Sequence, residues 1–84
     1  MIGERLKQLG YRFEGRLDKA IIDDALEYVD FNEIPLALET LCDQIYEYDV
    51  NICTEELLAL REIALEMGCD IKSVDNLKSL VTEM

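Results

Sequence analysis

The fold of this chain depends on the stretch Ile34-Pro-Leu-Ala-Leu-Glu-Thr-Leu-Cys-Asp-Gln-Ile-Tyr-Glu-Tyr-Asp49. Apolar side chains recur in it at steps of four and three residues, which is the period of one face of an α-helix: Ile34, Leu38, Leu41, Ile45 and Tyr48. This pattern predicts an amphipathic helix over residues 34–49 whose apolar stripe faces a core. Pro35 suits its first turn, where no amide has an intrahelical acceptor, and Asn32 is the predicted N-cap.

The opposite side of this predicted helix is acidic. Glu39, Asp43 and Glu47 are four residues apart, so like charges stack at a cost of roughly 0.2–0.5 kcal/mol per adjacent pair. Glu47 and Asp49 also lie near the C-terminal end, where the helix dipole disfavours anions. Local stability therefore does not explain these side chains, and they become candidates for binding a partner.

The net charge of −11 is carried by the middle of the chain, because residues 20–60 hold eleven acidic side chains and no Lys or Arg. Such a surface repels nucleic acid and anionic membranes and speeds encounter with basic partners. The simpler interpretation is that the acidity keeps a small protein soluble.

Shorter helices are predicted on both sides of the central one. On the N-terminal side, residues 2–9 form a helix that Gly10 ends, Tyr11 and Phe13 anchor a connector, and Asp18 caps a second helix reaching Val29. That second helix has Asp23, Glu27 and Asp30 on or beside its polar face, so the acidic faces of the two helices could merge.

On the C-terminal side, residues 50–53 are predicted to be a linker with two buried apolar side chains. Thr54 caps a helix that ends at Gly68, and Ser73 caps a last helix. The fold class expected for residues 1–84 is a single all-α domain, a small irregular bundle of about four to five short helices.

The sequence lacks the residues that most catalytic and metal sites need. There is no histidine to act as a base, there is no Gly-rich phosphate loop, and the acidic run 49–56 lacks the pattern of an EF-hand. Cys42, Cys53 and Cys69 are scattered, which argues against a disulfide framework or a zinc site and favours packing roles in a reducing compartment. We expect no enzymatic activity, no cofactor and no small-molecule substrate.

Two further classes are disfavoured. No apolar run suggests a signal peptide or a membrane span, so we expect a cytoplasmic protein that contacts neither membrane nor nucleic acid. Size and acidity are similar to those of acyl carrier proteins, but that family needs an Asp-Ser-Leu motif near mid-chain, and the only serines here are Ser73 and Ser79.

Three blocks resemble the MafI family of immunity proteins, which are small cytoplasmic antitoxins of bacterial polymorphic toxin and contact-dependent inhibition systems. The blocks are Ala25-Leu-Glu-Tyr-Val-Asp-Phe-Asn-Glu33, Ala37-Leu-Glu-Thr-Leu-Cys-Asp-Gln-Ile-Tyr-Glu-Tyr-Asp49 and Thr54-Glu-Glu-Leu57, and the resemblance covers roughly residues 17–68. It implies that the protein binds and neutralises the toxic C-terminal domain of a secreted effector, in several family systems an RNase of EndoU type. The resemblance implies this role but does not identify the residues that contact the toxin.

The residues by themselves favour the same kind of partner. An RNase presents basic surface to its substrate, and an inhibitor can occupy that surface with carboxylates. The predicted partner-binding residues are Glu39, Asp43, Tyr46, Glu47 and Asp49, with Asp23, Glu27 and Asp30 as neighbours. Tyr46 is predicted either to anchor the interface or to be partly buried against the next helix. The alternative function is an acidic adaptor or DNA mimic that binds a basic housekeeping protein.

Overall fold

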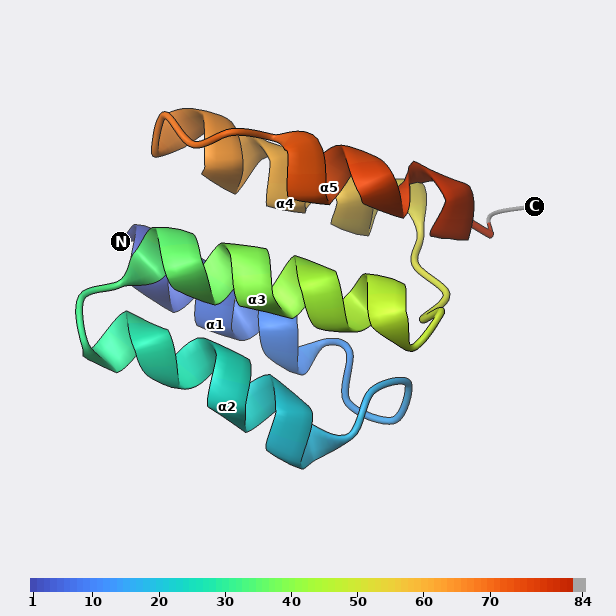
Figure 1. The fold of residues 1–84 in the computed structure, drawn as a ribbon, viewed down its shortest axis with the longest axis horizontal. Coiled ribbons are helices and arrows are strands. Elements are labelled where there is room, and N and C mark those ends of the chain that lie inside the picture. Colours follow the sequence, from blue (N-terminus) through green and yellow to red (C-terminus); the bar gives the residue numbers. More distant parts are fainter. Residues whose placement is uncertain (83–84) are drawn as a thin grey trace.

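The computed structural model describes residues 1–82, and within them the all-α prediction is confirmed. The elements, in chain order, are α1 (Ile2–Tyr11), α2 (Lys19–Asp30), α3 (Ile34–Glu47), α4 (Thr54–Glu66), α5 (Lys72–Asp75) and a 3₁₀ helix, η1 (Asn76–Leu80). They form two layers, with α2, α3 and α5 side by side in front and α1 and α4 behind (Figure 1). The helix α3 is in the middle of the front layer, so its inner side faces the rest of the molecule.

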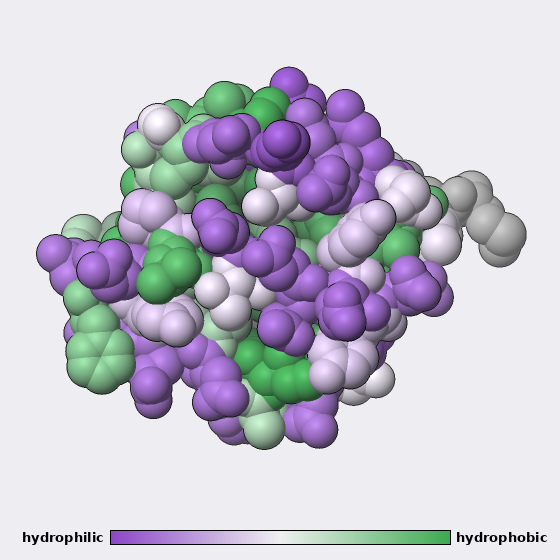
Figure 2. Space-filling model, in the orientation of Figure 1, coloured by the Kyte–Doolittle hydropathy of each residue, from purple (hydrophilic) through white to green (hydrophobic). Residues whose placement is uncertain are grey.

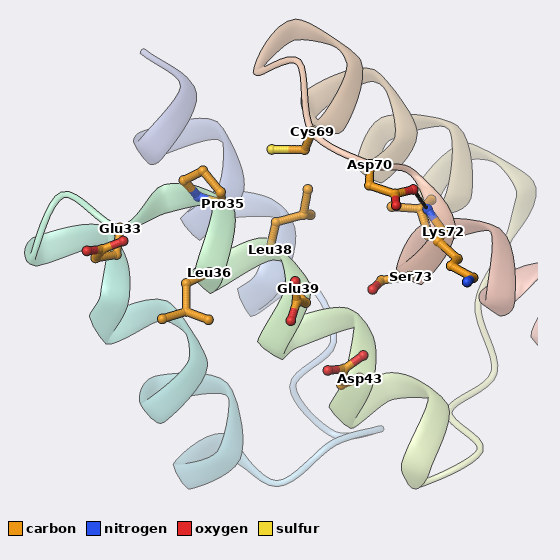
Figure 3. A pocket seen from close by; sticks show the side chains of 11 residues that line it. Glu33, Pro35, Leu36, Leu38, Glu39, Asp43, Cys69, Asp70, Lys72 and Ser73 are labelled. Atoms are coloured by element: carbon orange, nitrogen blue, oxygen red, sulfur yellow. Dashed lines mark hydrogen bonds between the residues drawn. The ribbon is translucent and has the colours of Figure 1, made fainter.

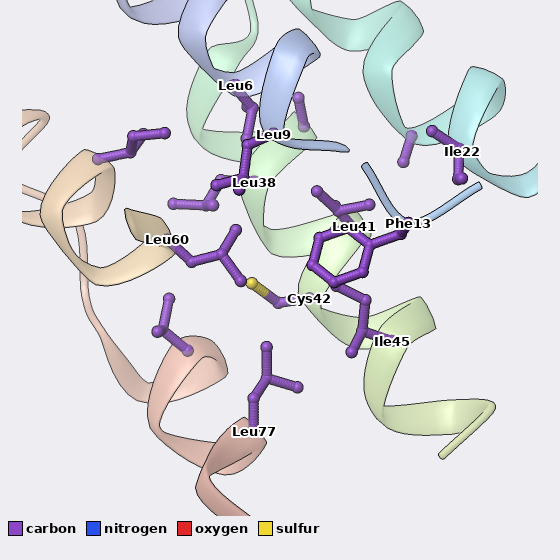
Figure 4. Packing of buried hydrophobic residues seen from close by; sticks show 14 of the residues in the cluster. Leu6, Leu9, Phe13, Ile22, Leu38, Leu41, Cys42, Ile45, Leu60 and Leu77 are labelled. Carbon is purple, nitrogen blue, oxygen red and sulfur yellow. The ribbon is translucent and has the colours of Figure 1, made fainter. Parts of the chain in front are cut away.

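The core is built on the inner side of α3, as the hydrophobic period predicts. Its Leu38, Leu41, Cys42 and Ile45 are at most 4 % exposed. Figure 4 shows them packed against side chains from the other elements, namely Leu6 and Leu9 of α1, Phe13, Ile22 of α2, Leu60 of α4 and Leu77 of η1. The connector after α3 also contributes to the core, because Val50 and Ile52 are buried as predicted.

The three longest helices end in the same way, with one residue in the left-handed region at Asn32, Asp49 and Gly68. At each end this residue donates its amide to the carbonyl three positions earlier, and the next amide donates to the carbonyl five positions earlier. This is the Schellman arrangement, which favours Gly and tolerates Asn or Asp in the left-handed position. The prediction that Gly68 ends its helix is confirmed.

Two predictions about α3 are wrong because of this ending. The helix ends at Glu47, so Tyr48 is its C-cap, is 56 % exposed and does not belong to the core stripe. Asn32 is not the N-cap of α3, since it terminates α2, and Glu33 takes the cap position instead. Pro35 does occupy the first turn of α3.

Other predicted helix ends also shift. Gly10 is inside α1, where the absence of a side chain lets Leu26 of α2 approach: a Cβ on Gly10 would be 2.8 Å from Leu26 Cδ1. Asp18 caps α2 as predicted, accepting the Ala20 amide at 2.8 Å.

The C-terminal helices differ more from the prediction. Cys53 rather than Thr54 is the N-cap of α4. The last helix is replaced by α5 and η1, and Asp70, not Ser73, accepts the Lys72 amide at 2.9 Å. The chain then returns to the linker before α4, where Thr82 donates its amide to the Ile52 carbonyl at 3.0 Å.

Candidate functional site

The outer side of α3 presents the predicted carboxylates to solvent. Glu39, Asp43 and Glu47 are all exposed, because the neighbouring positions 37, 38, 41, 42 and 45 turn into the core. Within residues 1–82 none of the three forms an ion pair. Their four-residue spacing corresponds to about 6 Å along the helix axis between successive carboxylates. We call Glu39, Asp43 and Glu47 the acidic stripe.

Tyr46 is beside the acidic stripe and is 53 % exposed. Leu36, one turn before Glu39 on the same side of α3, is 39 % exposed. An exposed aromatic ring and an exposed leucine beside unpaired carboxylates combine apolar contact area with hydrogen-bond acceptors, as the centre of a protein interface does. Asp49 is exposed just beyond the end of α3, in the left-handed position.

The predicted acidic neighbours on α2 do not behave as a group. Asp23 accepts a hydrogen bond from the Tyr11 hydroxyl at 2.7 Å and pairs with Lys19 at 3.1 Å, and these contacts, the Tyr11 hydrogen bond first, lower the pKa of its carboxyl. Asp30 pairs with Lys7 of α1 at 2.7 Å. Only Glu27 is exposed without an ion pair within residues 1–82. The acidic faces of α2 and α3 therefore do not merge through Asp23 and Asp30, which face the bases of the N-terminal segment.

A groove runs between α3 and α5, beside the acidic stripe (Figure 3). Its volume is about 770 Å³, and apolar side chains including Leu36, Leu38 and Val74 line it. Glu39 and Asp43 project from α3 toward the groove, and Asp70, Lys72 and Ser73 stand on the α5 side. The groove is therefore bounded by acids on the α3 side and by mixed charge on the α5 side.

Three charged residues of the groove are additional to the predicted set, namely Glu33, Asp70 and Lys72. They lie in the connections before α3 and α5 or at the start of α5, outside the helical pattern from which the site was predicted. Asp24 is also additional. It lines a smaller hollow of about 160 Å³ on the other side of α3, together with Tyr28, Thr40 and Gln44. For Asp24 and Glu33 the sequence carried a signal only in the charge count of the middle segment, and for Asp70 and Lys72 neither that count nor the helix period carried one.

The remaining chemistry of the described residues is limited. Burial is the main cause that raises the pKa of the Cys42 thiol to about 12, and the nearby charges of Asp43 and Glu39 add to it. This cysteine is therefore a poor nucleophile. Within residues 1–82 the three cysteines form no disulfide, and no group of three or more Cys, Asp or Glu side chains is placed to hold a metal ion. The arrangement is suited to binding cationic groups.

The front face as a whole is polar. Figure 2 shows hydrophilic residues over much of it, with hydrophobic residues in separate patches between them. None of the helices in residues 1–82 combines the length and the apolar character that crossing a bilayer requires. Comparisons with models of known protein families, with curated proteins and with solved structures find no match.

Proposed function

We propose that this protein is an immunity protein that binds and neutralises the toxic C-terminal domain of a cognate polymorphic or contact-dependent inhibition toxin. The toxin domain we propose is a basic nuclease, with an RNase of EndoU type as the first candidate. The resemblance of roughly residues 17–68 to the MafI family supports the role. On this proposal the protein acts in the cytoplasm by binding, without catalysis or a cofactor.

One observation carries the proposal: the acidic stripe places three exposed carboxylates on one face of a single helix, without ion pairs within residues 1–82, while several acids elsewhere are paired with bases. Arg5 pairs with Glu66 at 2.9 Å, Lys7 with Asp30 at 2.7 Å and Arg16 with Glu56 at 2.8 Å. Basic side chains of the N-terminal segment thus form ion pairs with several acids but not with the carboxylates of the acidic stripe. A basic partner would supply the missing counter-charges, and carboxylate–Arg pairs would fix its orientation.

The first experiment is to co-express the chain with the product of the neighbouring upstream gene. We expect a stoichiometric complex and rescue of cells from the toxicity of that product. An acidic adaptor or DNA mimic would behave differently, because it would compete with DNA for several unrelated basic proteins and would not require one particular toxin.

The second experiment changes Glu39, Asp43 and Glu47 together to Gln. Because mutual repulsion is relieved, we expect the melting temperature to stay or rise. Partner affinity should fall by about 2 kcal/mol or more, roughly 30-fold, since carboxylates that face Arg in an interface are costly to lose. Tyr46→Ala should likewise cost affinity more than stability.

A matched control has the same loss of charge on other elements. Glu4, Glu14 and Glu55 are exposed and form no ion pair within residues 1–82, so their joint change to Gln removes three charges away from α3. We expect this variant to bind like the parent apart from a small general charge effect. If the stripe variant bound and protected like the parent, the interface would lie elsewhere, first at Glu27 with Asp23 and Asp30.

A further inference from the structure

We infer that the groove between α3 and α5 seats a basic amphipathic helix of the partner, with Arg or Lys at four-residue intervals opposite Glu39 and Asp43, which line the groove, and Glu47, one turn further along α3. Aliphatic side chains of that helix would enter the groove beside Leu36 and Leu38. This inference rests on the proposed function, because it specifies which element of the partner the acidic stripe receives.

The spacing of the acidic stripe matches a helix laid along α3. Every α-helix advances about 1.5 Å per residue, so basic side chains at i, i+4 and i+8 recur at the same interval of about 6 Å as the three carboxylates. The i, i+4 rows of two facing helices run along each other when the helix axes cross at about −50°, and over the two turns concerned this crossing preserves the match. Each base then meets one carboxylate.

The walls of the groove favour a helix over an extended segment. They consist of side chains on α3 and α5 and in the short connections before these two helices, and most backbone amides and carbonyls in the helices already bond within their own helix. An extended segment would find few partners for its own backbone groups there. A helix brings its backbone bonds with it, which is the usual way an amphipathic segment occupies a hydrophobic groove.

The size and charge of the groove place the partner helix on the α5 side of α3. The volume of about 770 Å³ on this side exceeds the 160 Å³ hollow on the α2 side. Four carboxylates line the groove and only one base does, so its formal charge is −3 (four negative, one positive): Glu33, Glu39, Asp43, Asp70 and Lys72. This combination of acidic rim and apolar lining complements a helix that carries both basic and aliphatic residues.

A pair of isomeric peptides tests the register. The first is a capped 15-residue peptide of Ala and Gln with Arg at three positions four residues apart and Leu three residues after each of the first two. The second has the same composition, with the three Arg on different faces. Charge and helix propensity are equal, so only the arrangement differs. Binding is followed by amide shifts in heteronuclear NMR spectra at low salt.

We expect the first peptide to bind at least about tenfold more tightly than its isomer, since paired charges in register add to general attraction. The largest shifts should fall in residues 33–43 and 69–74. Equal binding of the two peptides, shifts centred outside the groove, or no binding of either would overturn the inference.

A matched pair of charge reversals gives a second readout. Lys72 lines the groove, and Arg61 is an exposed base on α4 that forms no ion pair within residues 1–82. We expect Lys72→Glu to tighten binding of the first peptide several-fold and Arg61→Glu to change it little. Equal effects would mean that only net charge matters, which would overturn the inference.

The outcomes also separate this inference from the proposed function. If the two peptides bind alike while the stripe variant loses its partner, the inference that the groove binds a helix is wrong and the proposed immunity function stands. If the first peptide occupies the groove but the stripe variant still binds and neutralises the toxin, the groove takes basic helices and the toxin binds elsewhere.

Discussion

The ion pair between Arg16 and Glu56 offers a sharp test of how the bundle is held together. Glu56 is only 2 % exposed, although it is charged. Arg16 donates two hydrogen bonds to the Glu56 carboxylate, at 3.0 and 2.8 Å, and also donates to the carbonyls of Asn51 and Arg12 at 2.9 Å each. Glu56 Oε1 in turn accepts the Cys53 amide at 3.0 Å, so one carboxylate ties the α1–α2 connector to the start of α4.

Replacing Arg16 by Met removes these contacts and leaves a buried carboxylate whose remaining counter-charge is Arg12, 3.8 Å away and more exposed. Removing one partner of a buried pair typically costs 3–5 kcal/mol, and we expect about 3 kcal/mol, at the low end, because 36 % of the Arg16 side chain is in contact with water. For a domain of this size that corresponds to a fall in melting temperature of roughly 12–24 °C. Glu56→Gln should cost about 2 kcal/mol, because the amide keeps the shape and can still accept the Cys53 N–H.

The double variant, Arg16→Met with Glu56→Gln, should be less destabilised than the sum of the two single variants, since no buried charge remains unpaired. We expect a coupling of about 1.5–3 kcal/mol in a double-mutant cycle measured by urea unfolding followed by circular dichroism. Arg5→Met is the control, because Arg5 pairs with exposed Glu62 and Glu66, and we expect a much smaller effect. Additive single-variant effects, or a cost for Arg16→Met no larger than that for Arg5→Met, would refute this reasoning.

Three further predictions concern packing, pH and salt. Gly10→Ala should destabilise the fold by about 1–3 kcal/mol in urea unfolding despite the better helix propensity of Ala, because the new methyl would be 2.8 Å from the buried Leu26, whereas Gln8→Ala should be nearly neutral. Hydrogen bonding to Arg16 lowers the pKa of Glu56 below the unfolded value of about 4.3. The ionised carboxylate therefore stabilises the fold above about pH 4.3, and this contribution is lost as the pH falls through the folded pKa. The urea midpoint of Glu56→Gln should accordingly fall less in acid than that of the parent. Association with the basic partner, followed by stopped flow, should slow markedly between about 20 and 150 mM salt while dissociation changes less, and an unchanged association rate would argue against steering by the acidic stripe.

The exposed residues on the acidic side of α3 could be predicted as a set from the sequence, but which acids of α2 are paired with bases could not. Glu39, Asp43, Tyr46 and Glu47 are exposed as a contiguous surface because a helix period places side chains relative to one another within a few turns. Asp23 and Asp30 have the same local pattern as Glu27, yet contacts with the N-terminal segment neutralise them. The pair Lys19–Asp23 spans four residues of α2 and can be read from the sequence, but the contacts of Asp30 with Lys7 and of Asp23 with Tyr11 cannot, because Lys7 and Tyr11 belong to α1.

The sequence by itself determined the helical class, the inner side of α3, the buried linker residues and the concentration of negative charge between residues 20 and 60. Those features depend on periodicity and composition, which act over neighbouring residues. Only the tertiary structure decided that Gly10 continues α1 against Leu26, that Arg16 neutralises Glu56 across forty positions, and that a groove opens between α3 and α5. These depend on which surfaces meet, because a close approach, an ion pair or a groove is a property of two segments and cannot be read from the pattern of either one alone.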